Sequence, residues 1–493
     1  MPHRLTPAAL PSLAPALRPR TERPRGIGVV HLGVGAFHRA HQAVFTEDAA
    51  ALTGDDRWGI CGVAPRSTAA VEALRPQDGL YSVLSRDADG GDLRVLGALR
   101  EVLHAGTDAE ALTERIAAPD TRIVSLTVTE QGYRRDPVTG GLRVADPEVA
   151  ADLSGRTPRT AVGMLVRGLL ARARADAGPV TVLCCDNIAD NGTATARLVT
   201  EYADRLPPAQ ASVLQAWLPA NVRFPATMVD RIVPAATDDD RTRIARQLGV
   251  ADAAAVVTEP FRQWVIQDDF AAARPAWERA GALLVDDVVP YERMKLRLLN
   301  GAHSTLAYLG GLAGRQTVAE AIADPALAEL VDRLMTEDVT PTLTGLAGFD
   351  LPAYRASLLR RFANPALRHR TAQIATDGSQ KLPQRLLAPA RQRLSAGARP
   401  HWLTLAVAAW IRNVTARRTD DGAPLTVSDP LAALIAEQVT DHTDAPATVR
   451  AVARCGVFGD DLAADPDFTD MVTTWLDRLI TDGATATVHA ALH

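Results

Sequence analysis

The sequence predicts an α/β fold in its first part and a mostly α-helical second part. Three observations lead to this prediction. Apolar runs typical of buried parallel strands recur between residues 27 and 186, separated by helix-like segments. The first of these runs passes through a glycine-rich turn into a helix. Beyond about residue 286, segments with helical periodicity follow one another with few strand-like runs.

The chain length sets the domain organisation. Its 493 residues exceed what one compact core holds, so two or three domains are expected. We place an N-terminal domain at residues 1–285, in which residues 1–25 form a Pro-rich, flexible lead-in. A helical domain then occupies residues 286–493.

Composition argues against several classes of partner. The net charge is -5 and no long basic run is present, so neither nucleic acid nor an anionic membrane is the expected partner. No apolar run approaches the roughly 20 residues that span a bilayer. The four cysteines form no C-x-x-C pair, and no secretory signal precedes them. These features predict a cytoplasmic protein that acts on a small molecule.

The first strand-like run, residues 27–32, leads through Gly33-Val34-Gly35 into a helix-like segment at 36–51. Strand, glycine turn and helix together are the context of a Rossmann-type dinucleotide site, where glycine lets the backbone approach the pyrophosphate. The pattern reads G-x-G-x-x-H, because His38 replaces the third glycine. A glycine turn without a ligand is the alternative. The residues expected to bind the cofactor here are Gly33, Gly35, Ala36 and Phe37.

Three histidines near this turn, His31, His38 and His41, raise the question of a metal. Zinc sites need a third and fourth ligand at recognisable spacing. His31 lies within the strand and no cysteine is nearby. We therefore predict no metal.

The second strand, at residues 57–64, bears on the choice of cofactor. An NAD site usually places an acidic residue near the end of this strand, to hold the ribose hydroxyls. Here Pro65, Arg66, Ser67 and Thr68 follow, with no carboxylate before Glu72. Arg66 could instead meet a 2′-phosphate. The predicted cofactor is NAD, with NADP as the alternative.

Further strands are expected at 80–85 and 93–103, as a meander inserted into the sheet, and at 122–129 and 180–186. A helix at 160–177 precedes the last of these. Polar residues just past the carboxyl ends of such strands line the ligand crevice of open α/β sheets. Thr129 and Asn187 are therefore expected at the cofactor, and Asn191 at the substrate or nicotinamide. For both asparagines, helix capping is the alternative role, and it does not exclude a functional one.

The helical part opens with residues 290–308, where Lys295, Asn300 and His303 share a broad sector of the predicted helix. A lysine beside an amide and an imidazole is suited to proton handling. The alternative is a half-buried lysine and a core histidine with purely structural roles. Further helical runs lie at 328–344, 353–363, 383–395, 401–413, 430–440 and 447–454.

A short span of this part concentrates hydrogen-bond donors and positive charge. As a solvated face it would be unremarkable, whereas beside an active site it would bind a carboxylate or several hydroxyls. Its members are Arg368, His369, Arg370 and Lys381.

Taken together, these stretches resemble the polyol-specific long-chain dehydrogenase/reductase family, also called the mannitol dehydrogenase family. The resemblance extends from Gly26 to about Phe468. It rests on G-V-G-A-F-H-R at 33–39, T-V-T-E-Q-G-Y at 127–133, the Asn191-Gly192 and Asp230-Arg231 pairs, the K-x4-N-x2-H helix, and D-G-S-Q-K at 377–381.

The resemblance implies a Rossmann-type domain with an expanded sheet, a helical domain, an active site between them and metal-free hydride transfer. It implies that Lys295 is the catalytic base, that Asn191 and Asn300 hold the oxyanion, and that His303 positions the substrate. Asp230 and Lys381 match substrate-contact positions, and Glu130 matches a residue on a proton path. The family's frequent monomers imply a monomer or weak oligomer.

The predicted reaction interconverts a sugar alcohol or aldonate with its ketose or ketouronate. The cation cluster favours an acid sugar, so fructuronate reduction to mannonate is our first hypothesis. The mannitol/fructose pair is the alternative. A nucleotide-binding regulator without activity would predict loss of the catalytic residues, and a zinc alcohol dehydrogenase would predict a cysteine-rich ligand set; neither matches this sequence.

Overall fold

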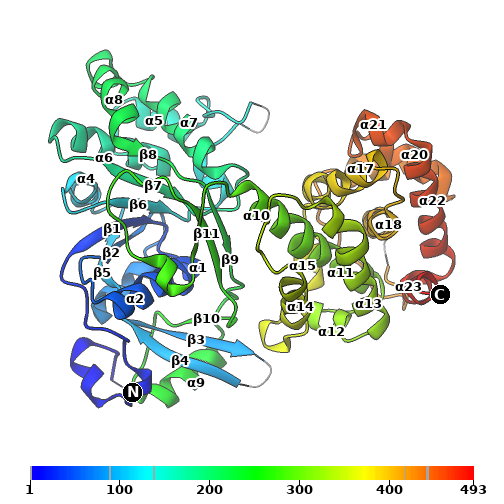
Figure 1. The fold of residues 1–493 in the computed structure, drawn as a ribbon, viewed down its shortest axis with the longest axis horizontal. Helices are drawn as coiled ribbons and strands as arrows, with labels where there is room; N and C mark the ends of the chain where they lie inside the picture. The colour runs from blue at the N-terminus through cyan, green and yellow to red at the C-terminus, as the bar shows by residue number, and fades with distance from the viewer. Residues whose placement is uncertain (1–2, 88–89, 137–138, 417, 440–443) are drawn as a thin grey trace. The chain divides into compact units, whose positions relative to one another are not determined.

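The computed structural model describes residues 3–87, 90–136, 139–416, 418–439 and 444–493. The chain divides into two compact units, with the division between Val289 and Pro290. The first is an α/β unit and the second is helical, which confirms the predicted fold class (Figure 1). Each unit is described by itself.

The N-terminal unit is built on a six-stranded parallel sheet with strand order β5-β2-β1-β6-β7-β8. Strands add outward on one side of β1, and the chain then returns to the other side. The order therefore reverses between β1 and β6, which is the topological switch point of an open α/β sheet. The strands are β1 (Ile27–Leu32), β2 (Gly59–Ala64), β5 (Leu99–His104), β6 (Ile123–Leu126), β7 (Val180–Cys184) and β8 (Val222–Arg223).

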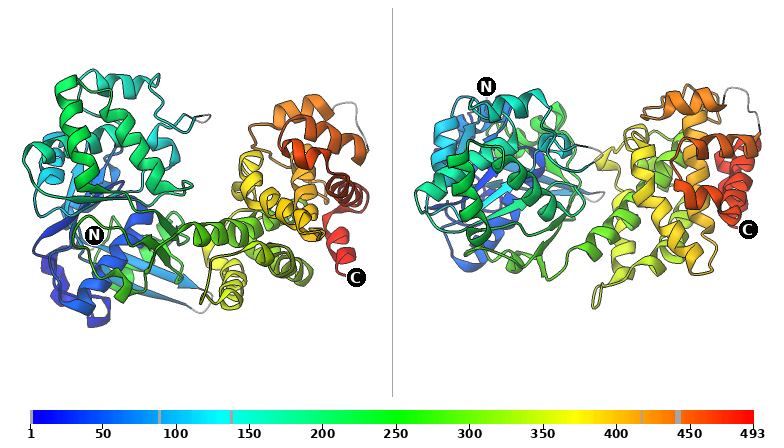
Figure 2. Two further views of the ribbon diagram at one scale, coloured as in Figure 1. Left: turned by 45° about the horizontal axis from the view of Figure 1, so that its top comes forward. Right: turned by 90° about the horizontal axis from the view of Figure 1, so that it is seen from above.

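Successive side chains of the central strands enter two different cores. Val30 and Leu32 of β1 pack on one face of the sheet, and Val29 packs on the other. This alternation follows from the pleat of a strand. Helices cover both faces (Figures 1 and 2). One face packs on α4 (Ala109–Ala117), α6 (Ala161–Arg174), α7 (Asn191–Ala203) and α8 (Pro208–Asn221), and the other on α2 (Gln42–Thr53) and α3 (Ala69–Leu74).

The expected meander is not inserted into the main sheet. The run at 93–103 breaks at Gly97, whose N–H donates to buried Glu47. The first part of this run, β4 (Gly90–Leu96), pairs antiparallel with β3 (Tyr81–Asp87), while β5 pairs with β2. Strands β3 and β4 join β10 (Val256–Thr258) in a separate three-stranded sheet. A second small sheet contains β9 (Thr227–Asp230), β11 (Gln263–Gln267) and β12 (Leu283–Val285).

The N-terminal lead-in is packed, so the prediction of a flexible segment is wrong. Leu5 and Leu13 are buried against apolar residues of β3, β4 and α9 (Asp238–Leu248). Short 3-10 helices at Pro7–Ser12 and Pro15–Leu17 suit the high proline content of this segment. The leucines provide the apolar surface that fixes the segment on the β3–β4 sheet.

The predicted helix at 36–51 is two helices, α1 (Ala36–Ala40) and α2. The break lies at His41, whose backbone leaves the helical region at φ -121° and ψ -87°. The His41 ring is buried, with Nε2 2.8 Å from the carbonyl oxygen of Gln263 and Phe37 stacked on it. Burial of this ring explains why the helical register is interrupted here.

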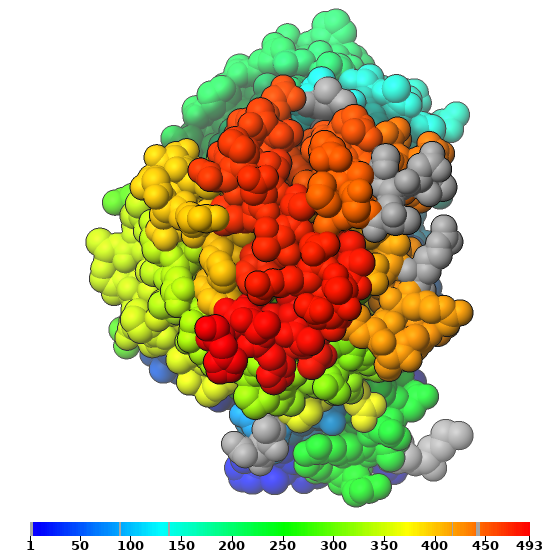
Figure 3. Space-filling view, turned by 90° about the vertical axis from the view of Figure 1, so that its right-hand side faces the viewer, coloured from blue at the N-terminus to red at the C-terminus, as the bar shows by residue number. Residues whose placement is uncertain are grey.

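The C-terminal unit is helical throughout its regular structure. Its central element is α18 (His401–Thr415), which is buried on nearly all sides, as expected of a core helix. Helix α18 packs against α11 (Gly301–Leu312) and α22 (Pro466–Thr481), and Figure 3 shows the last helices of the chain, in red, on the surface. The run predicted at 430–440 is α19 (Ala432–Val439), and its residue 440 lies outside the described residues. The other α-helices, none longer than twelve residues, are α10 (Val289–Met294), α12 (Val318–Ile322), α13 (Pro325–Arg333), α14 (Leu351–Phe362), α15 (Thr371–Ile374), α16 (Gly378–Leu382), α17 (Ala388–Ser395), α20 (Ala445–Arg454), α21 (Gly459–Ala464) and α23 (Gly483–Ala491).

Candidate active site

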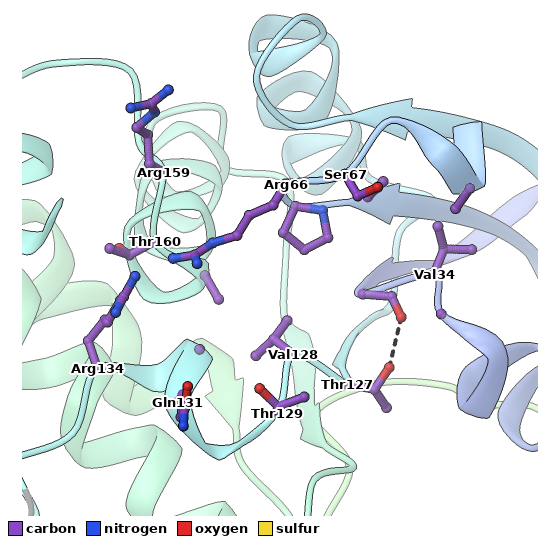
Figure 4. Close-up of a pocket in the computed structure, with 17 residues that line it drawn as sticks. Val34, Arg66, Ser67, Thr127, Val128, Thr129, Gln131, Arg134, Arg159 and Thr160 are labelled. Carbon is purple, nitrogen blue, oxygen red and sulfur yellow. Dashed lines mark hydrogen bonds between the residues drawn. The ribbon is translucent and has the colours of Figure 1, made fainter. Parts of the chain in front are cut away.

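The glycine turn after β1 has a conformation and a packing that only glycine satisfies. Gly33 has φ +105°, and a Cβ atom there would lie 2.0 Å from the carbonyl oxygen of Thr127. The Thr127 hydroxyl donates to the Gly33 carbonyl at 2.9 Å, drawn as the dashed line in Figure 4. The turn is thereby fixed against the end of β6, and Gly35 precedes the first residue of α1.

His38, at the position of the missing third glycine, is fully buried, and its ring stacks on that of His31 at 3.4 Å. Two flat rings in contact allow α1 to approach the strand closely, which is what a third glycine normally permits. Burial lowers the pKa of His31 to about 3 and that of His38 well below its ordinary value, so both rings are neutral.

A cavity of about 370 Å³ lies beside this turn, at the carboxyl ends of β1, β2 and β6 (Figure 4). It occupies the switch point of the sheet, where open α/β folds bind their ligands. Of the predicted cofactor residues, Gly33, Gly35, Arg66 and Thr129 line it. Ala36 and Phe37 form the start of α1 beside it, and Asn187 is exposed in the turn after β7.

The cavity has a strongly positive lining. Its charged lining residues are Arg66, Arg134 and Arg159, with no carboxylate among the described residues that line it. Glu148 lies outside the lining, 2.7 Å from Arg66 and also paired with Arg134. Residues of this kind around a glycine turn fit a phosphate-bearing dinucleotide.

The loop after β6 is held by the carboxylate of Asp186, a residue of the family motif at 186–192 for which the sequence predicted no role of its own. Asp186 accepts the N–H groups of Val128 and Thr129 at 2.9 and 3.0 Å, and the Tyr133 hydroxyl at 2.8 Å. Burial raises its pKa despite these bonds. The available signal was an acidic residue directly after an apolar strand. Glu130, the predicted proton-path residue, is exposed at the start of the 3-10 turn Glu130–Tyr133.

Asn191 is a packed residue at the start of α7. Its amide nitrogen donates to the carbonyl oxygens of Thr227 and Asp186 at 2.8 and 3.2 Å, and its amide oxygen accepts the N–H of Thr227 at 2.9 Å. These bonds tie α7 to β9, whose last residue is the buried Asp230. Both N–H groups of the Asn191 amide are thus engaged within the N-terminal unit, and its predicted role as an oxyanion donor stays a prediction.

In the C-terminal unit, the predicted catalytic helix contains a π-helical segment. Residues Lys295–Asn300 form the π-helix between α10 and α11, and the N–H of Gly301 reaches the carbonyl oxygen of Leu296, five residues back. The 100° per residue of a regular α-helix therefore does not describe how the side chains from Lys295 to His303 are placed around the axis. Such segments occur frequently at functional sites, because the extra residue redirects neighbouring side chains.

Lys295 and His303 are each 8% exposed, and Asn300 is half-buried. The π-helical segment is anchored by Arg297, which was not predicted as a functional residue. Arg297 donates to the carbonyl and hydroxyl oxygens of Thr342 at 3.0 and 2.8 Å and to the side chain of Gln392 at 2.7 Å. Lys295 thus belongs to a segment that hydrogen bonds hold in place on either side.

His303 lies in a cluster of aromatic and cationic side chains. The rings of His369 and Phe362 lie 5.1 and 4.7 Å from it. Its pKa is lowered well below the ordinary value, mainly by burial and then by His369, Arg361 and Arg385. The imidazole is therefore neutral near pH 7, with one nitrogen able to donate and the other able to accept.

Of the five residues predicted to bind the substrate, His369 is brought to His303. Asp230 is buried at the end of β9 in the N-terminal unit. Lys381 is half-buried and its ammonium donates to the carbonyl oxygen of Thr376 at 2.6 Å. Arg368 and Arg370 are exposed, and Arg370 forms a β-bridge with Thr317. The described contacts thus bring one of the five to the predicted catalytic helix.

The described residues contain neither a cluster suited to a metal ion nor a helix that could span a membrane. Within residues 3–87, 90–136, 139–416, 418–439 and 444–493, no group of three His, Cys, Asp or Glu is placed to hold a metal ion. Over the same ranges, no helix combines the length and apolarity needed to cross a bilayer.

Both units match models of one protein family. Residues 27–279 match the mannitol dehydrogenase Rossmann domain, and residues 287–480 match the mannitol dehydrogenase C-terminal domain. The chain belongs to the mannitol dehydrogenase family. This confirms the resemblance inferred from the motifs, and with it the Rossmann-type fold and the assignment to the oxidoreductases.

Two relatives and one solved structure match nearly the whole chain. D-mannonate oxidoreductase of Escherichia coli (strain K12) is 44% identical over 467 residues, covering 94% of this chain and 95% of that protein. Mannitol 2-dehydrogenase of Pyrenophora tritici-repentis is 39% identical, covering 94% and 81%. The Pseudomonas fluorescens mannitol 2-dehydrogenase ternary complex with NAD and D-mannitol is similar at TM-score 0.83 and 34% identity, covering 99% of each chain.

Lysine is rare in this member of the mannitol dehydrogenase family. Lysine and arginine together number 53, yet lysine occurs only at positions 295 and 381. Arginine supplies positive charge everywhere else, but it does not give up a proton in proteins. A count of lysines in the sequence would have distinguished Lys295 and Lys381 from the other cations.

Proposed function

We propose that the protein is an NAD-dependent oxidoreductase that interconverts D-fructuronate and D-mannonate by metal-free hydride transfer. The observation that carries the proposal is the buried Lys295, one of two lysines in an arginine-rich chain, held in a π-helical segment near the neutral His303. Lysine can alternately hold and release a proton, whereas arginine stays protonated.

The chemistry of the proposed reaction needs a base, a hydrogen-bond donor and a hydride acceptor. When bound, NAD supplies the acceptor, and Gly33, Gly35 and Thr129 are the residues that would hold it. Lys295 takes the hydroxyl proton as the alcohol is oxidised, and in the reverse direction it returns this proton to the carbonyl oxygen. The amide of Asn300 would stabilise the alkoxide-like oxygen. Asn191, the second donor that the family implies, would have to give up one of its bonds to Asp186 or Thr227 to do the same.

An acid sugar is preferred over a neutral polyol because of the charges around His303. Arg361 and Arg385 both act on its pKa, and His369 touches its ring. Guanidinium groups can stabilise a substrate carboxylate through charge-assisted hydrogen bonds. The similarity to D-mannonate oxidoreductase of Escherichia coli supports the same choice. The mannitol/fructose pair is the alternative, in view of the similarity to mannitol 2-dehydrogenases.

The test compares kcat/KM for fructuronate and fructose under identical conditions, with the cofactor held constant. We expect fructuronate to be preferred at least tenfold, since one charge-assisted hydrogen bond contributes roughly 1.5–3 kcal/mol. A preference for fructose would favour the mannitol 2-dehydrogenase alternative. Binding of cofactor without turnover of either substrate would instead indicate a nucleotide-binding regulator. For the assembly state we propose a monomer or weak oligomer, which sedimentation at several concentrations tests.

A further inference from the structure

The cofactor cavity differs from an ordinary NAD site at the end of β2. A Rossmann-type site for NAD places a carboxylate there, which hydrogen-bonds the ribose hydroxyls and repels a phosphate. In this chain the loop from β2 to α3 contains Pro65, Arg66 and Ser67, all three of which line the cavity. The position that would exclude a 2′-phosphate therefore carries a cation and a hydroxyl.

The side chain of Arg66 is available to a ligand. It is 63% exposed, and Figure 4 shows it extending across the cavity toward Thr160. Its backbone is fixed, because the carbonyl oxygen of Arg66 lies 3.0 Å from Nε2 of His104. Ser67 is ordered as well, since its hydroxyl accepts the N–H of Ala69 at 3.2 Å. A fixed backbone with an exposed guanidinium suits capture of an anion.

Glu148 is the group that sets the strength of this capture. It pairs with Arg66 at 2.7 Å, and it is also held by Arg134, which is paired with Asp146 at 3.5 Å. A ligand phosphate can replace the carboxylate on Arg66, while Arg134 continues to hold Glu148. An exposed ion pair is weak, so this exchange costs little.

We propose that the adenosine end of this cavity accepts a 2′-phosphate, so that the protein takes NADP as well as NAD, with Arg66 as the residue that determines this specificity. The inference rests on the proposed function only in requiring a nicotinamide dinucleotide as cofactor. Ser67 contributes a second hydrogen bond to the phosphate, and Glu148 competes with the phosphate for Arg66.

The test measures dissociation constants by calorimetry on the full chain, using 2′,5′-ADP and 5′-AMP as probes of the adenosine end. We expect the wild-type protein to bind 2′,5′-ADP at least as tightly as 5′-AMP. Arg66→Gln should weaken 2′,5′-ADP about tenfold, the effect of one charge-assisted hydrogen bond at a largely exposed site, and leave 5′-AMP within twofold. Glu148→Gln should strengthen 2′,5′-ADP several-fold, because the competing carboxylate is gone.

Arg174→Gln is the matched control. It removes the same charge from the same unit, but Arg174 is exposed at the end of α6 and does not line the cavity. We expect it to change the affinity for 2′,5′-ADP less than threefold. Equal losses for the two arginine variants would overturn the specific role of Arg66. Thermal melting checks that each variant is folded.

The outcomes separate this inference from the proposed function. If 5′-AMP binds and 2′,5′-ADP binds more than tenfold more weakly, the inference is overturned and NAD-dependent function stands. If neither probe nor NAD binds, the proposed function fails together with the inference. The ratio of kcat/KM for NADP and NAD gives a second readout, which should fall about tenfold in Arg66→Gln.

Discussion

At the scale of single residues, the lysines carry the most information about function. In a chain that otherwise uses arginine, Lys295 is buried and Lys381 donates to a backbone carbonyl. Charge alone does not explain Lys295, because arginine would supply it. The property that remains is the ability of an amine to release its proton, which is what alcohol oxidation requires.

Substitution of Lys295 by arginine tests this reasoning directly. Lys295→Arg keeps the charge and the donors but cannot release a proton, so we expect kcat to fall by roughly 10²–10⁴-fold. Lys295→Met should fall equally, and cofactor affinity should stay within twofold in both. Lys381→Arg is the control, for which we expect altered KM with largely retained kcat. Substantial turnover in Lys295→Arg would show that Lys295 contributes its positive charge and not proton transfer.

Glu47 predicts a pH dependence of stability. It is fully buried in α2, and burial raises its pKa from 4.5 to about 7, an effect that Arg94 partly opposes. Between these values the folded state keeps a proton that the unfolded state has lost. Stability from this group is therefore complete below pH 4.5 and is lost as the pH rises through 7, by about 3 kcal/mol in total.

We expect Glu47→Gln, which cannot ionise, to remove this dependence. The difference in free energy of unfolding between the variant and the wild type should grow in favour of glutamine from pH 5 to pH 8. Urea unfolding at several pH values measures it. The matched control substitution is Glu114→Gln, at an exposed position of α4. A flat difference for Glu47 would contradict the prediction.

At the scale of elements, irregularities in helices and turns position the candidate site. The π-helical segment Lys295–Asn300 interrupts a helix that the sequence predicts as regular, and the buried His41 divides another. The glycine turn brings the backbone of β1 against that of β6 at Gly33. In each case the local deviation sets the direction of side chains beside a cavity or a catalytic residue.

A comparison of Gly33 with Gly54 distinguishes the cost of a left-handed backbone from the cost of a steric clash. Both have positive φ, +105° and +72°, but a Cβ atom at Gly54 would meet nothing within 4 Å. We expect Gly54→Ala to cost about 1–2 kcal/mol of stability, from the left-handed backbone alone. Gly33→Ala should cost more and should weaken NAD binding at least tenfold, because the Thr127 carbonyl must move. Melting temperatures and calorimetric NAD titrations measure both effects; equal behaviour of the two variants would show that close packing at Gly33 is unimportant.

At the scale of the whole molecule, each unit contains a distinct part of the candidate machinery. The N-terminal unit holds the glycine turn and the positive cavity, and the C-terminal unit holds Lys295, Asn300 and His303. This division matches the two domain models of the mannitol dehydrogenase family. The proposed division of labour assigns cofactor binding to the first unit and proton transfer to the second.

Metal-free hydride transfer predicts that chelation leaves the whole enzyme active. After dialysis against EDTA, we expect kcat within twofold of the untreated protein, because an amine rather than a metal-bound group takes the proton. Elemental analysis should find less than stoichiometric zinc. Loss of turnover that added Zn²⁺ restores would refute the mechanism, and a zinc-dependent alcohol dehydrogenase treated in parallel serves as the positive control.

The sequence by itself determined the class of each unit, the glycine turn and the position of the lysine that we propose as the catalytic base. These features depend on local regularities: alternation in strands, helical periods, and a glycine pair that follows an apolar run. Arg66 could also be identified from the sequence, because this required only its position just after the end of β2. Charge at such a position can be read without knowing the fold in detail.

Only the tertiary structure decided which distant residues meet. The lead-in packs through Leu5 on β3 and β4, the Asn191 amide is bound by Thr227, and the His369 ring lies on His303. Burial and hydrogen bonding between segments far apart in the chain leave no periodic signal in the sequence. The π-helical segment could not be predicted from the sequence either. Its Arg297 is held by Thr342 and Gln392, which lie far along the chain from its own helix.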